Sequence, residues 1–522
     1  MILRDLLPDD VPLQIQGRLD VEIACLVYDS RRVTPGALFF ALPGTKTDGT
    51  RFAAQALAQG AQAVVTLPGT TIAPLSDSHT LAAEAAQATF ITCTTPRVLL
   101  GLVADRFYHQ PSAQLTLVGV TGTSGKTTTT YVLESIWRAM GWAAGVIGTV
   151  NYRYQGREMP APFTTPEAVE LQELLSVMVA EKVSHVVMEV SSHALVQERV
   201  QGCRWDGAVF TNLGRDHLDF HRDLEDYFAA KSRLFLDALA TSEKPDRFAV
   251  INADDPWGAR LLAQSLPGRV LTYGFQPGVT VSVRNVENTF QGLQGVLRLA
   301  EQEVPFSSAL IGELHLYNLM AAATVAYALG VPAEVIAAGI AHCPGVPGRM
   351  EAIIAGQPFG VLVDYAHKPD ALDKMLRSVR RLTDKRVLTV FGCGGDRDRG
   401  KRPLMGEVTG RLSDVVILTS DNPRTEDPWH IIAEAEPGLL QAGVTKVDDP
   451  ATVGTLQHGY LVIKDRREAI HAALRGAQPG DVVVIAGKGH EDYQIIGTTK
   501  YHFDDREEVR NYLRPLYGEG QA

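Results

Sequence analysis

The sequence predicts an α/β protein of three domains, and three observations support this prediction. The chain has 522 residues, which is more than a single hydrophobic core usually serves. Short β-branched runs alternate with helix-like segments over most of its length, a pattern typical of parallel sheets covered by helices. A Pro- and Gly-rich stretch at residues 343–351, a predicted hinge, separates two such series. We therefore expect domains at residues 1–111, 112–342 and 343–522.

Composition and charge exclude several classes of function. Hydrophobic residues make up 45% of the chain and charged residues 21%, as in ordinary soluble globular proteins. The net charge of −11 argues against nucleic acid or an anionic membrane as the main partner. The five cysteines have no paired spacing, the first residues lack a signal-peptide pattern, and no apolar run reaches membrane-spanning length. We expect a cytoplasmic monomer that is not inserted in a membrane and acts on small molecules.

The first 111 residues predict a small α/β unit. Residues 37–42 form an expected buried strand that leads into the loop P-G-T-K-T-D-G, followed by a helix at 51–59 and a strand at 62–66. The segment Y-D-S-R-R at residues 28–32 is either an anion-binding corner or a turn, and the residues alone favour the turn.

The stretch L-V-G-V-T-G-T-S-G-K-T-T-T-T at residues 117–130 predicts a phosphate-binding loop. A buried strand ending near Val120, a glycine-rich turn and a helix starting near Thr127 would direct backbone N–H groups and a helix N-terminus at one point. Lys126 would reach the terminal phosphates, and Thr127 would offer a hydroxyl to Mg²⁺. A flexible turn is the alternative, but strand and helix signals lie on the correct sides. The expected ATP contacts are Gly122, Thr123, Ser124, Gly125, Lys126, Thr127 and Thr128.

The chain after this loop continues the strand–helix alternation. We expect the helix to end at Gly141 and a strand to follow at 145–150. Thr165 is the predicted N-cap of the next helix, with Pro166 at its first position. The strand at 185–190 carries Glu189 near its carboxyl end, where an α/β nucleotide fold holds a Mg²⁺ ligand, although a solvated strand end remains the alternative.

The second half of the central range combines polar motifs with apolar elements. After a strand at 208–210 comes T-N-L-G-R-D-H-L-D, and a helix is predicted at 227–235. Lys231 lies among apolar and aromatic neighbours there, and this setting by itself favours a snorkelling side chain. Residues 278–311 alternate as antiparallel strands do, and 315–329 predict a helix capped by Gly330.

The last 180 or so residues predict a second ligand-binding domain. Four predicted strands each run into a loop rich in charge and glycine: residues 360–364, 387–391, 415–419 and 482–485. Ligands of open parallel sheets gather outside the carboxyl ends of the strands. Two classes of function fit a nucleotide site that faces such a domain across a hinge. One is a ligase or kinase that activates an anionic substrate, and the other is a nucleotide switch or motor. The density of Arg, His, Lys and Asp at the strand ends favours chemistry on a small charged substrate.

Ordered motifs along the whole chain resemble those of the Mur ligase family of peptidoglycan synthesis, and within it the members that add meso-diaminopimelate. They include G-V-T-G-T-S-G-K-T, E-V-S-S-H-A-L-V-Q-E-R, T-N-L-G-R-D-H-L-D-F-H, Y-F-A-A-K, H-L-Y-N-L-M-A-A, D-Y-A-H-K-P-D-A-L, G-C-G-G-D-R-D-R-G-K-R-P, D-N-P-R and G-K-G-H-E-D-Y. The resemblance implies a UDP-substrate-binding N-terminal domain, a central P-loop ATPase with a mostly parallel sheet, and a Rossmann-like C-terminal domain. It also implies that ATP, UDP-N-acetylmuramoyl-L-alanyl-D-glutamate and meso-diaminopimelate give the UDP-tripeptide, ADP and phosphate. The lysine-adding homologues and, more remotely, folylpolyglutamate synthetase are the alternatives.

The same resemblance implies roles for individual residues. The UDP-substrate would contact Ser30, Thr45, Lys46, Thr164, Thr165, Ser191, Gln197 and Arg199. ATP would also contact Asn318, Arg349 and Asp364. Mg²⁺ would be held by Thr127, Glu189, His217 and Lys231 as its carbamate, and Lys126, Lys231 and His217 would serve catalysis. Diaminopimelate would contact Arg397, Asp421, Asn422, Pro423, Arg424, Gly487 and Glu491.

Arg424 is the residue expected to choose the amino acid. Diaminopimelate differs from lysine by a second carboxylate, and a guanidinium can bind a carboxylate through two hydrogen bonds. Pro423 would restrict the turn and Asn422 would brace it, so that Arg424 points into the cleft.

Overall fold

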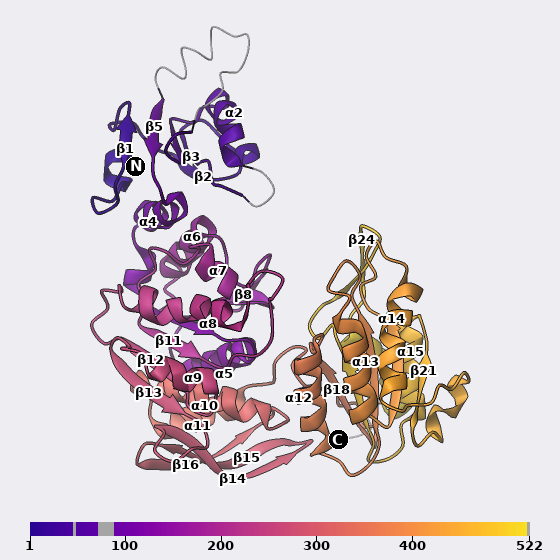
Figure 1. The fold of residues 1–522 in the computed structure, drawn as a ribbon. Coiled ribbons are helices and arrows are strands. Elements are labelled where there is room, and N and C mark those ends of the chain that lie inside the picture. Colours follow the sequence, from indigo (N-terminus) through magenta and orange to yellow (C-terminus); the bar gives the residue numbers. More distant parts are fainter. Residues whose placement is uncertain (45–47, 71–87, 519–522) are drawn as a thin grey trace.

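The computed structural model describes residues 1–44, 48–70 and 88–518, and its fold is α/β as predicted. Within these ranges the chain forms three large sheets and one two-stranded hairpin. Each large sheet falls inside one of the three predicted domain ranges, while the boundaries themselves stay predictions. Figure 1 shows the N-terminal unit stacked on the central one and the C-terminal unit beside the central one. In the described part of the chain, no helix is both long and apolar enough to cross a membrane.

The N-terminal sheet has the strand order β1-β5-β4-β3-β2, and only β1 is antiparallel to its neighbour. Its strands are β1 Gln14–Gln16, β2 Cys25–Val27, β3 Ala37–Phe40, β4 Ala63–Thr66 and β5 Thr89–Thr92. Its α-helices are α1 Leu3–Leu6, α2 Ala53–Ala58 and α4 Pro96–Phe107. The helix expected at 51–59 is split, because its first turn is the 3₁₀-helix Gly49–Phe52. The predicted turn at 28–32 is the short 3₁₀-helix Ser30–Arg32, capped by the Asp29 carboxylate.

The central sheet has eleven strands in the order β16-β15-β14-β13-β12-β11-β6-β10-β7-β8-β9. Its middle is parallel, and hairpins extend it antiparallel at both edges. The strands are β6 Thr116–Thr121, β7 Ala144–Ile147, β8 Asn151–Tyr154, β9 Arg157–Pro160, β10 His185–Glu189, β11 Gly207–Phe210, β12 Phe248–Asn252, β13 Arg269–Tyr273, β14 Val281–Thr289, β15 Gly292–Leu299 and β16 Gln302–Ser308. The helices are α5 Lys126–Ala139, α6 Ala168–Ala180, α7 Ser192–Val196, α8 Leu224–Arg233, α9 Pro256–Leu262, α10 Leu314–Ala328 and α11 Ala333–His342.

Both faces of this sheet are buried, which explains its nearly continuous apolar strands. Successive residues of β10 point to opposite faces, so that Val187 joins the core under α5, α10 and α11 while Val186 and Met188 join the core under α6 and α8. The parallel middle therefore carries the phosphate loop on a rigid base.

Three predicted boundaries in the central range are wrong. The strand expected at 145–150 ends at Ile147, where the chain turns into the β8 hairpin. Helix α6 begins at Ala168 with Glu167 at the N-cap position, because the Thr165 hydroxyl instead donates to the Glu189 carbonyl at 2.8 Å. The helix predicted to end at 235 extends further, because the π-helix Leu234–Leu239 follows directly after α8.

The C-terminal sheet has the order β17-β18-β22-β19-β20-β21, with β17 alone antiparallel to its neighbour. Its strands are β17 Glu351–Ala352, β18 Gly360–Asp364, β19 Val387–Cys393, β20 Val415–Ser420, β21 Gly459–Val462 and β22 Val482–Ala486; the separate hairpin is β23 Tyr493–Ile496 and β24 Thr499–His502. Helices α12 Pro369–Arg380, α13 Lys401–Leu412 and α14 Pro428–Gln441 pack on one face, and α15 Arg466–Gly476 and α16 Asp505–Tyr517 on the other. The carboxyl ends of β18, β22, β19 and β20 share one edge, as the sequence predicts.

Candidate active site

The phosphate loop lies between the end of β6 and the start of α5, in the strand–turn–helix setting that the sequence predicts. Gly122 and Gly125 have φ angles of +142° and +89°, a region that favours glycine. A Cβ atom at Gly122 would lie 1.9 Å from the Thr211 hydroxyl oxygen, and one at Gly125 would lie 2.3 Å from Oδ1 of Asn318. The two glycines therefore let the loop approach its neighbours closely. This contact also places Asn318 beside the loop.

The segment after β11 supports the loop through its main chain. The Thr123 N–H donates to the Asn212 carbonyl at 2.8 Å, and the Ser124 N–H donates to Oδ1 of Asn212 at 3.0 Å. The Thr211 hydroxyl donates to the Ser124 carbonyl at 2.7 Å. Lys126 Nζ donates to the carbonyls of Gly122 and Thr123 at 2.8 and 3.1 Å. Burial lowers the pKa of this ammonium, against the opposing effect of the Glu189 carboxylate.

The side chain of Lys231 also contacts this loop. Its side chain is 1% exposed, and Nζ donates to the Gly122 carbonyl at 2.9 Å. Burial lowers the pKa of this amine well below its usual range. The snorkelling interpretation is therefore wrong, because the nitrogen ends inside the protein beside the loop rather than in solvent.

The residues predicted to hold Mg²⁺ have suitable donor chemistry. The Glu189 carboxylate is 1% exposed and accepts from both the N–H and the hydroxyl of Thr149 at 2.9 Å. Burial lowers the pKa of His217 to about 4, so its imidazole is neutral near pH 7. The carboxylate and the Thr127 hydroxyl are oxygen donors of the kind that Mg²⁺ prefers, and a neutral imidazole is also able to bind a metal ion. No group of three His, Cys, Asp or Glu side chains arranged around a metal position occurs within the described ranges.

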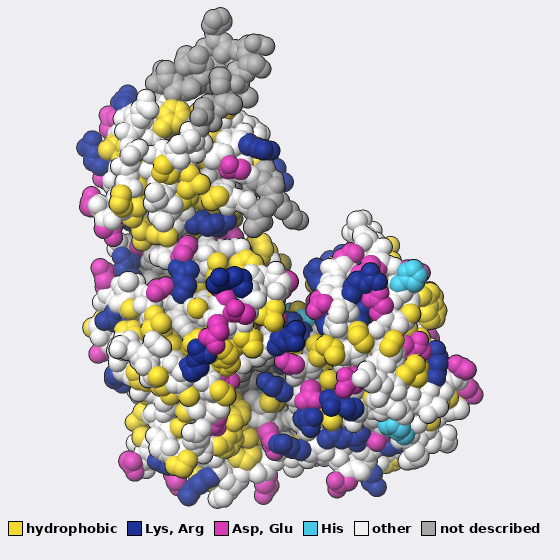
Figure 2. Space-filling view, viewed as in Figure 1, with side chains coloured by type: hydrophobic (Ala, Val, Ile, Leu, Met, Phe, Trp, Pro, Cys, Tyr) yellow, Lys and Arg dark blue, Asp and Glu magenta, His cyan; other side chains and the backbone are white. Residues whose placement is uncertain are grey.

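Two polar contacts join the central and C-terminal units at this loop. Arg349 Nη2 approaches the Thr127 hydroxyl at 3.5 Å, and Lys368 forms an ion pair with Asp216. Asp364 accepts from the N–H of Met350 at 2.7 Å, which fixes the segment that carries Arg349. Figure 2 shows Lys and Arg side chains along the hollow between these two units. Asp216 and Lys368 were not among the predicted site residues, and they become apparent only when the two units meet.

Five of the residues predicted for the UDP-substrate form one connected cluster. The Thr165 hydroxyl accepts from the Ser191 N–H at 3.0 Å, and the Thr165 carbonyl accepts from Arg199 at 3.0 Å. Arg199 also donates to the Gln197 amide oxygen at 2.7 Å, and the hydroxyls of Thr164 and Thr149 lie 3.1 Å apart. Because Thr149 also binds Glu189, the cluster reaches the predicted metal ligand.

The remaining residues of this set belong to the N-terminal unit. Ser30 begins the short 3₁₀-helix whose Arg32 pairs with Glu170 of α6 at 3.0 Å, so its turn lies against the central unit. Thr45 and Lys46 lie outside the described residues.

The residues predicted for diaminopimelate gather at the carboxyl edge of the C-terminal sheet. Asp421, Asn422, Pro423 and Arg424 follow β20, Gly487 and Glu491 follow β22, and Arg397 follows β19. Asn422 Nδ2 donates to the Glu491 carboxylate at 3.0 Å, which links two of these loops. Asp421 is 7% exposed, and its Oδ1 has no hydrogen-bond partner among the described residues. This oxygen retains its hydrogen-bonding capacity within the predicted site, and its contact with the Lys488 ammonium is an ion pair at 3.7 Å.

Lys488 belongs to this group of side chains, although it was not among the predicted site residues. Its fully buried Nζ lies 3.7 Å from Asp421 Oδ1 and 3.5 Å from Glu491 Oε2. Burial raises the pKa of Glu491, and the Lys488 ammonium opposes this effect. The motif G-K-G-H directly after a buried strand was the signal that could have identified it.

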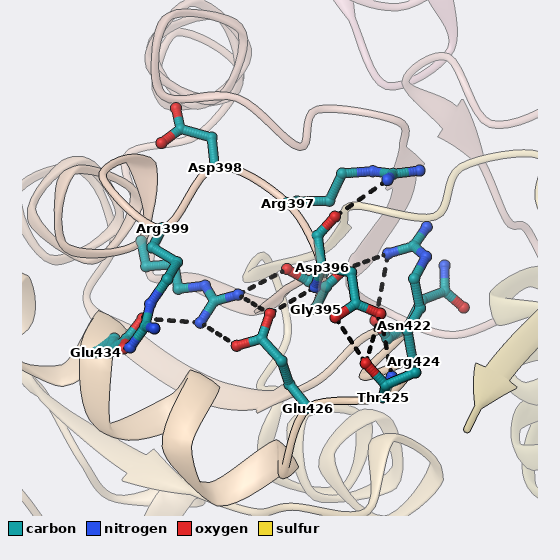
Figure 3. Close-up of polar contacts among 12 residues, drawn as sticks. Gly395, Asp396, Arg397, Asp398, Arg399, Asn422, Arg424, Thr425, Glu426 and Glu434 are labelled. Carbon is teal, nitrogen blue, oxygen red and sulfur yellow. Dashed lines mark hydrogen bonds and ion pairs between the residues drawn. The ribbon is translucent and has the colours of Figure 1, made fainter. Parts of the chain in front are cut away.

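Arg424 is held differently from the prediction. Its φ angle is +52°, its N–H donates to the Ile495 carbonyl at 3.0 Å, and Nη1 donates to the Gly395 carbonyl at 2.8 Å (Figure 3). The Asn422 side chain, expected to brace this turn, instead accepts from the Ile495 N–H at 2.9 Å and donates to Glu491. The hairpin that contains Ile495 therefore fixes the Arg424 backbone.

Comparisons with known proteins agree with this arrangement. Family models match residues 22–108 (Mur ligase family, catalytic domain), 120–326 (Mur ligase middle domain) and 348–489 (Mur ligase, glutamate ligase domain). A protein of Geobacter metallireducens named UDP-N-acetylmuramoyl-L-alanyl-D-glutamate--2,6-diaminopimelate ligase is 46% identical over 524 residues, covering 100% of both chains. A Gloeobacter violaceus protein of the same name is 46% identical, covering 95% of this chain and 94% of its own.

Solved structures show the same fold. A structure described as a UDP-N-acetylmuramoyl-L-alanyl-D-glutamate--2,6-diaminopimelate ligase aligns with a TM-score of 0.70 and 33% identity, covering 99% of both chains. A Mycobacterium tuberculosis folylpolyglutamate synthase, described in complex with ADP and AMPPCP, aligns with a TM-score of 0.59 at 16% identity over 80% of this chain and 94% of its own, and shows the fold alone. The matched domains and full-length relatives establish that this chain belongs to the Mur ligase family.

Proposed function

We propose that this chain is an ATP-dependent ligase that joins meso-diaminopimelate to UDP-N-acetylmuramoyl-L-alanyl-D-glutamate, in the synthesis of peptidoglycan precursors. The observation that carries the proposal is that one chain combines the Lys126 loop with a cluster of charged side chains that includes Asp421 and Arg424, and that the two units touch beside that loop through Arg349 and Thr127. Full-length relatives named as 2,6-diaminopimelate ligases support the choice of substrates. We further propose a monomeric cytoplasmic enzyme with a UDP-binding N-terminal domain.

The central unit would activate the substrate. The γ-carboxylate of the UDP-dipeptide attacks the γ-phosphorus of ATP, which forms an acyl phosphate and releases ADP. Lys126 would move its ammonium from the loop carbonyls to the phosphoryl oxygens, where negative charge spreads in the transition state. Asn318 and Arg349 border the same loop, and Thr127, Glu189, His217 and carbamylated Lys231 would hold Mg²⁺. When bound, this cation would neutralise charge on the phosphates.

The C-terminal unit would bind diaminopimelate, whose amino group is the nucleophile. A neutral amino group of diaminopimelate attacks the acyl carbon, phosphate leaves, and the amide forms with loss of one proton. Asp421 and Glu491 are suited to accept hydrogen bonds from the other amino group, and Arg397 and Arg424 to bind carboxylates. No protein nucleophile takes part in this scheme.

Lys231 would act as its carbamate. Its buried setting leaves a neutral amine that can add to CO₂, which gives a carbamate and one proton. The carbamate would supply anionic oxygen beside the loop, which an ammonium cannot do. Lys231→Ala should lose activity, and short carboxylic acids in the buffer should restore part of it. An unmodified amine in a high-resolution map with Mg²⁺ and CO₂ present would contradict this role.

The proposed reaction can be tested with purified wild-type protein. ADP release is measured with ATP and the UDP-dipeptide, in parallel with meso-diaminopimelate, L-lysine or no amino acid, and the product is identified by mass. We expect amino-acid-dependent ADP release and a UDP-tripeptide with meso-diaminopimelate. Preference for L-lysine would indicate the lysine-adding activity. ADP release that needs no amino acid would indicate a nucleotide switch.

A further inference from the structure

We infer that Arg402 and Glu426 form a positioning pair that sets the spacing between the two arginines proposed to bind diaminopimelate. This inference rests on the proposed function and assigns roles to two residues beneath the site. Arg402 is fully buried and the Glu426 side chain is one quarter exposed, and we infer that the pair acts through the loops that carry Arg397 and Arg424.

The two loops leave neighbouring parallel strands and run side by side. Cys393 at the end of β19 pairs in register with Ser420 at the end of β20. The Gly395 N–H then donates to the Asn422 carbonyl at 2.9 Å. A Cβ atom at Gly395 would lie 1.9 Å from the Pro423 carbonyl oxygen, so the backbones are as close as glycine allows. A small change in either loop therefore moves the other.

Arg402, in the first turn of α13, is hydrogen-bonded to both loops. Its two terminal nitrogens bind both carboxylate oxygens of Glu426 at 2.8 and 3.0 Å, and Nη1 binds Glu434 at 2.7 Å. Nη2 also donates to the Gly394 carbonyl at 3.2 Å. Through Arg402, helix α13 is hydrogen-bonded to the first residue of one loop, to Glu426 near the end of the other loop and to Glu434 of helix α14. Figure 3 shows Glu426 and Glu434 side by side in this network. A lysine could not reproduce this fork.

Glu426 completes the connection to the first loop. It accepts from the Asp396 N–H at 2.5 Å, and the Asp396 carboxylate accepts from the Thr425 hydroxyl at 2.8 Å. The Arg402 guanidinium and the Asp396 N–H together hold the pKa of Glu426 at about 2, so the carboxylate stays charged throughout the physiological range. Asp396 itself has φ +52°, a conformation that needs such support.

Carbonyl groups of the same segment bind the two arginines proposed to contact diaminopimelate. Arg397 Nη1 donates to the Asp396 carbonyl at 3.1 Å, and Arg424 Nη1 donates to the Gly395 carbonyl at 2.8 Å. Each guanidinium is thus attached to a residue of the segment that Arg402 and Glu426 fix. Loss of the pair should leave both arginines present but wrongly spaced for a ligand with two carboxylates.

The test is a full kinetic comparison of Arg402→Lys with wild type. We expect the KM for diaminopimelate to rise about tenfold or more, as for residues that orient ligand-binding groups, while the KM values for ATP and the UDP-dipeptide stay within about twofold. The kcat measured at saturating diaminopimelate should stay close to that of wild type. The matched control is Arg386→Lys, at the opposite edge of the same sheet, where a buried arginine pairs with Asp481 at 2.6 Å. That variant should lower stability without a selective change in the KM for diaminopimelate.

A milder variant keeps the inference falsifiable if Arg402→Lys does not fold. Thr425→Val removes the hydroxyl that links Thr425 to Asp396 at the exposed end of the network. It should raise the KM for diaminopimelate alone, by about threefold. The inference is overturned if folded variants keep the wild-type KM for diaminopimelate, or if all three KM values rise together. Wild-type protein that shows no diaminopimelate-dependent reaction would instead contradict the proposed function.

Discussion

The proposed nucleotide loop and the two proposed diaminopimelate loops are stabilised by different kinds of interaction. Residues 122–126 are held mainly by hydrogen bonds between backbone groups and the short side chains of Thr211 and Asn212. Residues 394–400 and 421–427 are held largely by guanidinium–carboxylate contacts around Arg402. The first arrangement is suited to present backbone N–H groups to a polyphosphate, and the second is suited to hold charged side chains at a fixed spacing.

Because of this difference, we expect substitutions in the two regions to change different kinetic parameters. Substitutions in the nucleotide loop should affect the chemical step, because its lysine interacts with charge that develops in the transition state. Substitutions in the C-terminal loops should affect the choice and affinity of the amino acid. The following experiments separate these two kinds of failure.

Lys126→Ala should have the largest effect. Loss of the ammonium should lower kcat by at least ~10³-fold, since it removes a major electrostatic contact to the transferred phosphoryl group. Steady-state kinetics and circular dichroism would check activity and folding. The matched control is Lys244→Ala, whose ammonium binds the Leu115 carbonyl at 2.8 Å at the other end of β6 and should be dispensable. Near-normal turnover of folded Lys126→Ala would refute the nucleotide assignment.

Arg424→Ala should come next and should be selective. The second carboxylate of diaminopimelate would lose its partner in a desolvated site, at a cost of roughly 3–5 kcal/mol, or over a hundredfold in kcat/KM. Trace activity with L-lysine, which lacks this carboxylate, should be unchanged or slightly raised. Arg377→Ala, an exposed arginine on α12 paired with Asp373, is the control and should behave as wild type. Retained diaminopimelate activity in Arg424→Ala would contradict the specificity assignment.

Gly395→Ala should separate the two C-terminal loops. The added methyl group meets the Pro423 carbonyl oxygen at 1.9 Å, so we expect a loss of roughly 1–3 kcal/mol in the free energy of unfolding and a raised KM for diaminopimelate. Gly454→Ala is the control, since its nearest neighbours would be 3.9 Å away. Denaturant unfolding and substrate titration would measure both effects. Equal behaviour of the two variants would show that the close approach of the loops does not matter.

The smallest effect concerns pH and the sheet under the nucleotide loop. His185, at the start of β10, stacks on Trp142 with the two ring centroids 4.0 Å apart. Burial lowers the pKa of His185 to about 4. The unfolded chain binds a proton near pH 6.5 that the folded chain does not, so the free energy of unfolding should fall as pH drops from about 6.5 to 4. His185→Phe should show a shallower slope over this window in urea titrations. An unchanged slope would mean that other titrating groups control how the free energy of unfolding depends on pH in this range.

Several features of this molecule were predictable because they depend on neighbours in sequence. The phosphate loop follows from a buried strand, glycines and a helix start in direct succession, and the charged loops follow from strands whose carboxyl ends must share one edge. Proline and glycine also mark the predicted hinge at residues 343–351, which stays a prediction.

Features that depend on tertiary contacts were not predictable from the sequence. Thr165 looked like an N-cap, but its hydroxyl is used by Glu189 and Ser191. Lys488 and the Asp216–Lys368 pair gain their partners from distant strands and from another unit. The neighbours of Lys231 in sequence favoured a snorkelling side chain, and only the family resemblance implied a role for it at the site, because local sequence cannot show that its amine ends beside Gly122.

The most direct test of the account follows oxygen atoms through the reaction. The UDP-dipeptide is prepared with ¹⁸O in both oxygens of the γ-carboxylate and incubated with ATP, diaminopimelate and wild-type enzyme, and the released phosphate is analysed by mass spectrometry. If the central unit forms an acyl phosphate that the amine then attacks, each phosphate carries one ¹⁸O atom, and the other stays in the new amide. Unlabelled phosphate would mean that water attacks ATP directly, which would contradict the proposed ligase mechanism and favour a nucleotide switch.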